Sequence, residues 1–168
     1  MVATRSVVAL ESSMDGAEIA VRAAQPADVA GMAALVQENV TAGHLLPRSA
    51  AEIAASLGDW VIALVNGQVV GIGSLLLMNP DLVEVRSLAV ATEYRSYGLG
   101  ALIVNELVVQ ARARRIKTVF ALTRAVSFFV RLGFTITDKE RFPEKVWRDC
   151  VKCPLLTCCD ETAVVLEP

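Results

Sequence analysis

The sequence lacks an excess of positive charge. Its 168 residues include 16 lysines and arginines against 18 aspartates and glutamates, a formal net charge of −2. Nucleic-acid binding depends on a basic surface that neutralises phosphates, so we expect no nucleic-acid partner. Internal repeats and low-complexity linkers are also absent, and 54% of the residues are hydrophobic. This composition favours one compact domain over disorder.

The N-terminal residues lack the pattern of a secretory signal peptide. A hydrophobic run that is too short for the core of such a signal is followed by acidic residues. We therefore expect residues 1–17 to be a flexible tail, residues 18–168 to form the domain, and the protein to be cytoplasmic. In that compartment the 4 cysteines are expected as thiols or metal ligands rather than as disulfides.

Charged residues are absent from residues 60–80, a stretch long enough to cross a bilayer. However, Asn66-Gly67-Gln68 interrupts it between two runs that are rich in β-branched residues. An Asn-Gly pair between two such runs is typical of a β-hairpin. The sequence therefore predicts a hairpin here and no membrane partner.

Histidine is almost absent, and the cysteines lie near the C-terminus. His44 is the single histidine and stands in a predicted loop, where a structural role is the more common one. Cys150 and Cys153 have a spacing that suits zinc, but Cys158 and Cys159 are adjacent, which is awkward for shared tetrahedral ligation. We predict no metal site, and zinc is the alternative that metal analysis would decide.

One stretch that is present carries the strongest functional signal. Residues 83–90 form an apolar run expected as a strand, and Arg95-Ser96-Tyr97-Gly98-Leu99-Gly100 precedes a long predicted helix. Glycine lets a backbone turn tightly near a ligand, and the first amides of a helix have no partner within it. These amides attract anions, and Arg95 adds a positive charge. The stretch therefore predicts a binding site for a phosphate or pyrophosphate.

The order of the predicted elements indicates an α+β fold with a central mixed sheet. From residue 18 the sequence predicts a strand, two helices, three strands, a helix, a strand, a short helix, a strand and a last strand over residues 162–166. An antiparallel hairpin thus precedes a strand–helix–strand unit, and the anion-binding stretch lies where the helix of that unit begins.

This arrangement resembles the GNAT N-acetyltransferases. Arg-x-x-Gly-x-Gly after Leu-Ala-Val is similar to the loop that holds the pyrophosphate of acetyl-CoA in that family, and Leu132-Gly133-Phe134 is similar to the segment that ends the family's short helix. The resemblance implies a GNAT fold with acetyl-CoA as the cosubstrate. It also implies that a strand edge splays from its neighbour to hold the pantetheine arm. The implied cofactor-binding residues are Leu88, Ala89, Val90, Arg95, Ser96, Tyr97, Gly98, Leu99, Gly100 and Ala101.

Three further stretches resemble the amino-acid N-acetyltransferases, the N-acetylglutamate synthases of arginine biosynthesis, in their short single-domain version. These stretches are residues 43–49, residues 83–90 and residues 142–161. The resemblance implies that the α-amino group of L-glutamate attacks the thioester directly. Two alternatives stay open: another amino acid, amine or protein N-terminus as the acceptor, and a CoA-binding sensor without catalysis. A homodimer is a further expectation.

Glu84 is the predicted general base. It is an acidic side chain in an apolar strand, where desolvation is expected to raise its pKa toward a useful range, and the synthases have a glutamate at the matching position. The alternative is a pair with Arg86 on the same strand face. Phe129 stands where many family members have a tyrosine that protonates the leaving thiolate. Thr123 matches a hydroxyl position of the synthases and is either that proton donor or a strand-end residue that bonds backbone.

The carboxylates of an amino-acid substrate require cationic groups, and arginine can hold a carboxylate with two hydrogen bonds. The resemblance places the loop that contains Arg48 and Ser49 over the substrate. Arg86 and Lys145 are the other predicted substrate-binding residues, and the alternative for each cation is a solvent-facing role. Ser49 is also predicted to cap the next helix, with Glu52 completing a capping box.

Overall fold

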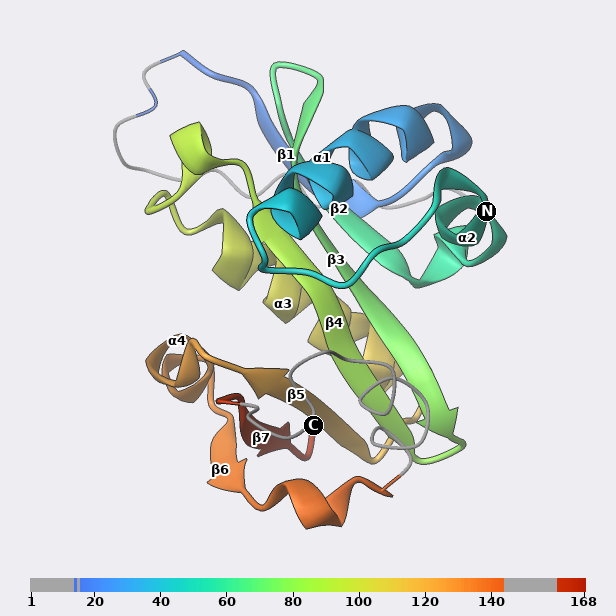
Figure 1. The fold of residues 1–168 in the computed structure, drawn as a ribbon, viewed down its shortest axis with the longest axis vertical. Helices are drawn as coiled ribbons and strands as arrows, with labels where there is room; N and C mark the ends of the chain where they lie inside the picture. Colours follow the sequence, from blue (N-terminus) through green and yellow to red (C-terminus); the bar gives the residue numbers. More distant parts are fainter. Residues whose placement is uncertain (1–13, 15, 144–159) are drawn as a thin grey trace. The chain divides into compact units, whose positions relative to one another are not determined.

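The computed structural model describes residue 14, residues 16–143 and residues 160–168. Within these residues the strands of one mixed sheet follow the order β1-β2-β3-β4-β5-β7-β6 (Figure 1). The elements are β1 (Ile19–Ala23), α1 (Val29–Thr41), α2 (Ala50–Ala55), β2 (Trp60–Val65), β3 (Gln68–Asn79), β4 (Leu82–Val90), α3 (Leu99–Ala113), β5 (Thr118–Thr123), α4 (Val126–Arg131), β6 (Thr135–Thr137) and β7 (Thr162–Leu166). The predicted fold class and order of elements are therefore confirmed.

The chain divides into two compact units. The first contains residues 1–74 and 87–107, and the second contains residues 75–86 and 108–168. Strands β3 and β4 and helix α3 contribute residues to both units.

The predicted hairpin is part of the first unit. Strand β2 pairs antiparallel with both β1 and β3, and all of its residues are buried. Asn66 and Gly67 form the turn with φ angles of 48° and 78°, and positive φ at both central residues is the geometry that Asn-Gly favours in a two-residue hairpin. In the part of the chain that the structure describes, no helix has the length and apolar character needed to cross a membrane.

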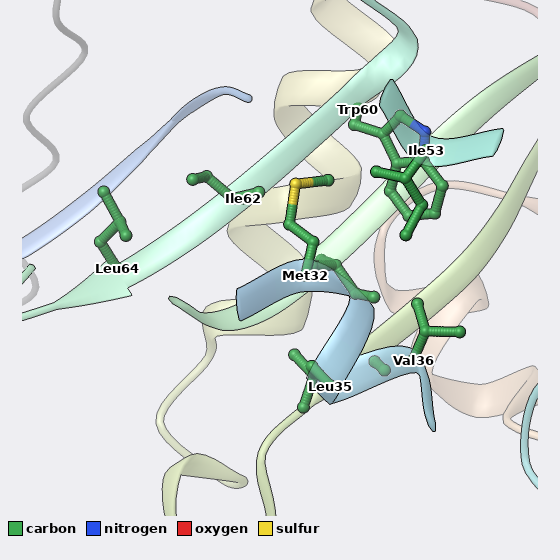
Figure 2. Close-up of a cluster of buried hydrophobic side chains, with 9 residues drawn as sticks. Met32, Leu35, Val36, Ile53, Trp60, Ile62 and Leu64 are labelled. Atoms are coloured by element: carbon green, nitrogen blue, oxygen red, sulfur yellow. The ribbon is translucent and has the colours of Figure 1, made fainter. Parts of the chain in front are cut away.

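One hydrophobic cluster of the first unit lies between the sheet and helices α1 and α2. Figure 2 shows side chains of the two helices gathered against side chains of β2. Trp60 also donates a hydrogen bond from Nε1 to Ser56 Oγ at 3.1 Å, so its polar edge is satisfied at the border of the core. The buried residues of this cluster are Met32, Leu35, Val36, Ile53, Trp60, Ile62, Leu64, Ile72 and Ala89.

Asp28 holds the start of α1. Its carboxylate accepts hydrogen bonds from Nη1 and Nη2 of Arg22, at 2.8 and 3.1 Å, and from the amide of Gln25 at 2.7 Å. Burial alone would raise the pKa of Asp28, but these donors outweigh burial and hold the pKa below its ordinary value. The carboxylate therefore stays charged and links β1 to the helix.

The second unit is built around β5 and β7. Strand β5 pairs antiparallel with β7, β7 pairs antiparallel with β6, and residues Leu82–Glu84 of β4 pair parallel with Thr118–Phe120. The rings of Phe120 and Phe142 stack with centroids 4.0 Å apart in its core. Helix α4 ends before Gly133, which has a φ of 95°, as predicted for the residue that stops this helix.

Candidate functional site

The predicted anion loop lies between a short 3₁₀ turn, Thr92–Tyr94, and α3. Ser96 and Gly98 have φ angles of 72° and 78°, and both are exposed. A Cβ on Gly98 would meet nothing within 4 Å, so the glycine serves the backbone conformation and not close packing. The left-handed residues turn the chain sharply into the helix at an exposed position.

The first amides of α3 precede the hydrogen bonds that the helix makes along its own backbone. The hydrogen bond from the amide of Leu102 to the carbonyl of Gly98 closes the first turn at 3.2 Å. The amides of Leu99, Gly100 and Ala101 precede it and have no acceptor within the helix. Together with the positive end of the helix dipole, they form an anion-binding arrangement of the kind that the sequence predicts.

Arg95 is tied to the end of β4. Its Nε donates a hydrogen bond to the carbonyl of Val90 at 3.1 Å, which leaves the two terminal nitrogens of the guanidinium for other acceptors. The side chain is exposed. One bond therefore holds a positive charge beside the anion loop and joins this loop to the strand predicted to hold the pantetheine arm.

Strand β4 pairs with β5 along only the first part of its length. The parallel ladder between β4 and β5 covers Leu82 to Glu84, whereas β4 continues to Val90. Ser87 lies in between with a φ of 54°, a left-handed conformation that interrupts the extended backbone. This distortion is not predicted from the sequence, because a serine within an apolar strand is only a weak signal for it. A cofactor role for Leu88, Ala89 and Val90 stays a prediction.

Glu84 and Thr123 belong to the second unit. Glu84 is 3% exposed and stands opposite Phe120 in the ladder, so the burial predicted for this side chain is present. Thr123 ends β5, and its Oγ1 accepts a hydrogen bond from the amide of Ala125 at 2.8 Å. This is the backbone-bonding role that the sequence analysis gave as the alternative. The hydroxyl proton can still be donated to another acceptor.

Phe129 belongs to the core. It is buried and makes edge-to-face contacts with Phe128 and Phe134, with centroids 5.1 Å apart in each pair. Because a phenyl ring has no hydroxyl, this position supplies packing and cannot protonate a thiolate.

The predicted substrate loop combines a helix cap with a partly buried arginine. Ser49 Oγ accepts from the amide of Glu52 at 3.1 Å, and a Glu52 side-chain oxygen accepts from the amide of Ser49 at 2.6 Å, which confirms the capping box. Arg48 donates from Nη1 to the carbonyl of Pro47 at 2.8 Å. Its Nε is buried and has no hydrogen-bond partner among the residues that the structure describes.

Arg86 and Lys145 are the other two predicted substrate-binding cations. Arg86 is half-buried in β4. Lys145 and the four cysteines at 150, 153, 158 and 159 lie outside the described residues. Among the described residues, no group of three or more histidine, cysteine, aspartate or glutamate side chains could hold a metal ion.

The fold and the loop at the start of α3 define an acetyl-CoA-dependent acyltransferase. The model of the acetyltransferase (GNAT) family matches residues 37–134, which is more than half of the chain. The chain therefore belongs to the GNAT family, and acetyl-CoA is its cosubstrate.

Particular relatives extend this result. An uncharacterized N-acetyltransferase of Chlorobaculum tepidum is 36% identical over 152 residues, which are 90% of this chain and 98% of the relative. The amino-acid acetyltransferase of Shewanella oneidensis is 29% identical over 126 residues, which are 74% of this chain but 28% of that longer protein.

Solved structures agree with this fold. A Mycobacterium tuberculosis protein in complex with CoA and a second ligand has a TM-score of 0.73 and 27% identity, with 88% of this chain and 98% of that one covered. The N-acetylglutamate synthase of Neisseria gonorrhoeae, complexed with CoA and N-acetyl-glutamate, has a TM-score of 0.77 and 24% identity, with 89% of this chain and 35% of that one covered. The second likeness concerns the fold alone.

Proposed function

We propose that this enzyme transfers the acetyl group of acetyl-CoA to the α-amino group of L-glutamate, as an N-acetylglutamate synthase of arginine biosynthesis. The observation that carries the choice of an acidic acceptor is the buried Nε of Arg48, a guanidinium donor without an acceptor among the described residues. An N–H group at such a position is costly unless a ligand or water accepts from it. The matches to proteins named amino-acid acetyltransferase support the same choice.

The cofactor is held mainly by backbone. The amides of Leu99, Gly100 and Ala101 and the guanidinium of Arg95 bind the diphosphate. The lack of an acceptor for these amides within the helix and the anchored side chain of Arg95 support this. The edge of β4 from Leu88 to Val90 binds the pantetheine arm. One N–H group of this edge donates to the carbonyl oxygen as it gains negative charge.

The side chains perform the proton transfers. Glu84 takes a proton from the α-ammonium group, directly or through one water, and the neutral amine attacks the thioester carbon. A C–N bond forms, the C–S bond of the tetrahedral intermediate breaks, and the nitrogen gives its second proton to water. The leaving thiolate takes a proton from water, either directly or through the hydroxyl of Thr123, which regains its own proton from water.

Acceptor selection depends on cations. Arg48 binds one carboxylate of glutamate through its fork of N–H donors, and Arg86 and Lys145 complement the remaining negative charge. Ser49 contributes through the cap that holds the loop, because its hydroxyl oxygen already accepts from the amide of Glu52.

A thiol-release assay tests the proposal. Acetyl-CoA turnover is measured with L-glutamate, L-glutamine, L-aspartate, L-leucine, a simple alkylamine and a short peptide with a free N-terminus. We expect the highest kcat/KM with L-glutamate. Preference for another acceptor would overturn the substrate assignment and leave the acetyl transfer intact. CoA binding without turnover of any acceptor would favour a sensor.

A further inference from the structure

Two glycines of β3 lie against α3 within the first unit. A Cβ on Gly73 would stand 2.7 Å from Cγ2 of Ile103 and 3.1 Å from Cδ1 of Leu107, and a Cβ on Gly71 would stand 2.8 Å from Cδ1 of Ile103. Non-bonded carbon atoms do not approach to 2.7 or 2.8 Å, and 3.1 Å is tighter than most such contacts. The helix therefore packs on bare backbone and comes closer to the strand than any other residue at these two positions would allow.

The same glycines also contact β4. The Cβ position of Gly73 is 3.4 Å from Cδ1 of Leu88, and that of Gly71 is 3.6 Å from the carbonyl oxygen of Ala89. Gly71 and Gly73 thus touch α3, whose start supplies the anion-binding amides, and the edge of β4 predicted to hold the pantetheine arm. They link the two backbone elements of the proposed cofactor site.

A β-bulge turns these glycines toward α3. The register between β2 and β3 runs from Leu64 opposite Val69 to Ala63 opposite Gly71, so Val70 is an extra residue. On the other side of the bulge, Val69 faces α1, where a Cβ on Gly31 would stand 3.2 Å from Cγ2 of Val69. Strand β3 therefore packs closely against a helix on each of its two faces. Val69 faces α1, whereas Gly71 and Gly73 face α3, the helix that follows the cofactor loop.

We propose that Gly71 and Gly73 are positioning residues for acetyl-CoA. Because these two residues have no side chain, α3 can lie close to β3. This close packing determines where the first amides of α3 lie relative to the Leu88–Val90 edge. The inference rests on the proposed binding of the cofactor at the anion loop and goes beyond it, because both glycines lie in β3 and outside that loop.

The two positions differ in how a clash can be relieved. Cγ2 of Ile103 branches directly from Cβ, and a β-branched side chain in a helix is confined to one main χ1 rotamer. A methyl group on Gly73 can therefore be accommodated only if the helix moves. Cδ1 of Ile103 is the free end of the side chain and can rotate away from a methyl group on Gly71. Gly73→Ala should displace α3 more than Gly71→Ala.

The expected difference between Gly73→Ala and Gly71→Ala is tested by calorimetric titration of each variant with CoA, together with its thermal unfolding. We expect Gly73→Ala to raise the Kd for CoA about tenfold and Gly71→Ala to raise it about threefold, because a small displacement of binding groups has a large effect. Adding Ile103→Ala to Gly73→Ala should return the Kd to that of Ile103→Ala alone. Gly31→Ala is the matched control: it strains the α1 face, lowers the unfolding temperature and leaves the Kd unchanged.

Several outcomes would overturn the inference. One is a folded Gly73→Ala variant that binds CoA as tightly as the unchanged protein, and another is an equal rise in Kd for Gly31→Ala. If Gly73→Ala does not fold, Gly71→Ala becomes the deciding variant. An unchanged Kd for CoA in Gly71→Ala would then also contradict the inference. Arg95→Ala, measured in parallel, separates the proposals: if it leaves the Kd unchanged, the loop assignment fails, whichever way the glycine variants behave.

Discussion

The region proposed to hold acetyl-CoA and the residues proposed to act on the acceptor are built from different parts of the chain. The cofactor region uses backbone: the first amides of α3, the edge of β4 and the turn with left-handed Ser96 and Gly98. The acceptor chemistry uses side chains, namely Glu84, Arg48 and Thr123. Backbone groups are the same in every sequence with this fold, whereas side chains differ. The contrast explains why the family is defined by its cofactor and why the acceptor needs separate tests.

The largest effect is expected for Glu84→Gln. The amide cannot take a proton from the α-ammonium group, so kcat should fall about a hundredfold at neutral pH. The loss should shrink as pH rises, because more of the acceptor is then already deprotonated. Profiles of kcat/KM against pH for both proteins measure this, with Glu38→Gln on the exposed face of α1 as the control. A profile like that of the unchanged enzyme would exclude Glu84 as the base.

Arg48→Ala tests the acceptor side without touching the cofactor loop. Loss of a charged fork on a carboxylate should raise the KM for L-glutamate about thirtyfold, with the KM for acetyl-CoA unchanged. Steady-state kinetics with each substrate varied in turn provide both values. Arg48→Lys keeps the charge but loses the fork, and it should recover only part of the affinity. An unaltered KM for glutamate in Arg48→Ala would show that this loop does not bind the carboxylate.

Arg95→Ala should have the opposite selectivity. Removing the guanidinium that is anchored to the carbonyl of Val90 should raise the KM for acetyl-CoA about tenfold and leave the KM for glutamate unchanged. Because the side chain is exposed, the difference from the unchanged enzyme should shrink as salt is added. If both KM values rose together, the separation into a backbone region and a side-chain region would be too simple.

The smallest effect is expected for Asp28→Asn, which provides a reference for stability alone. The folded-state pKa of Asp28 lies below its ordinary value of 3.8. Its stabilising contribution is therefore complete above that value and is lost as pH falls through the folded-state pKa. The variant should be about 1 kcal/mol less stable at neutral pH, with the difference vanishing in acid. Urea unfolding at several pH values measures this, and both KM values should stay the same.

Local signals explain most of what could be predicted from the sequence. The Asn66-Gly67 turn, the capping box of Ser49 and the glycine that ends α4 each depend on residues within a few positions of one another. The exposed turn before α3 also follows from Gly98, whose φ is 78°. These elements form as predicted because short-range sterics and hydrogen bonds already favour them.

The features that could not be predicted depend on distant residues. The left-handed Ser87 and the bulge at Val70 arise within strands whose sequences fit an ordinary extended conformation. The hydroxyl of Thr123 had two plausible partners, and the structure shows it bonded to the amide of Ala125. Isolated glycines in a strand do signal a close approach of another backbone or a bulge. They do not say which helix approaches Gly71 and Gly73.

By itself, the sequence determined the order of the elements, the turn with Arg95 and Gly98 before α3 and the resemblance to the family, because these follow from patterns among residues that are near one another in the chain. Tertiary structure decided how closely α3 approaches β3, which face of that strand each residue occupies and which donors of Arg48 and Arg95 already have acceptors. The physical reason is close packing. Whether a methyl group fits beside Ile103 depends on Gly71 and Gly73, which are about thirty residues away in the chain.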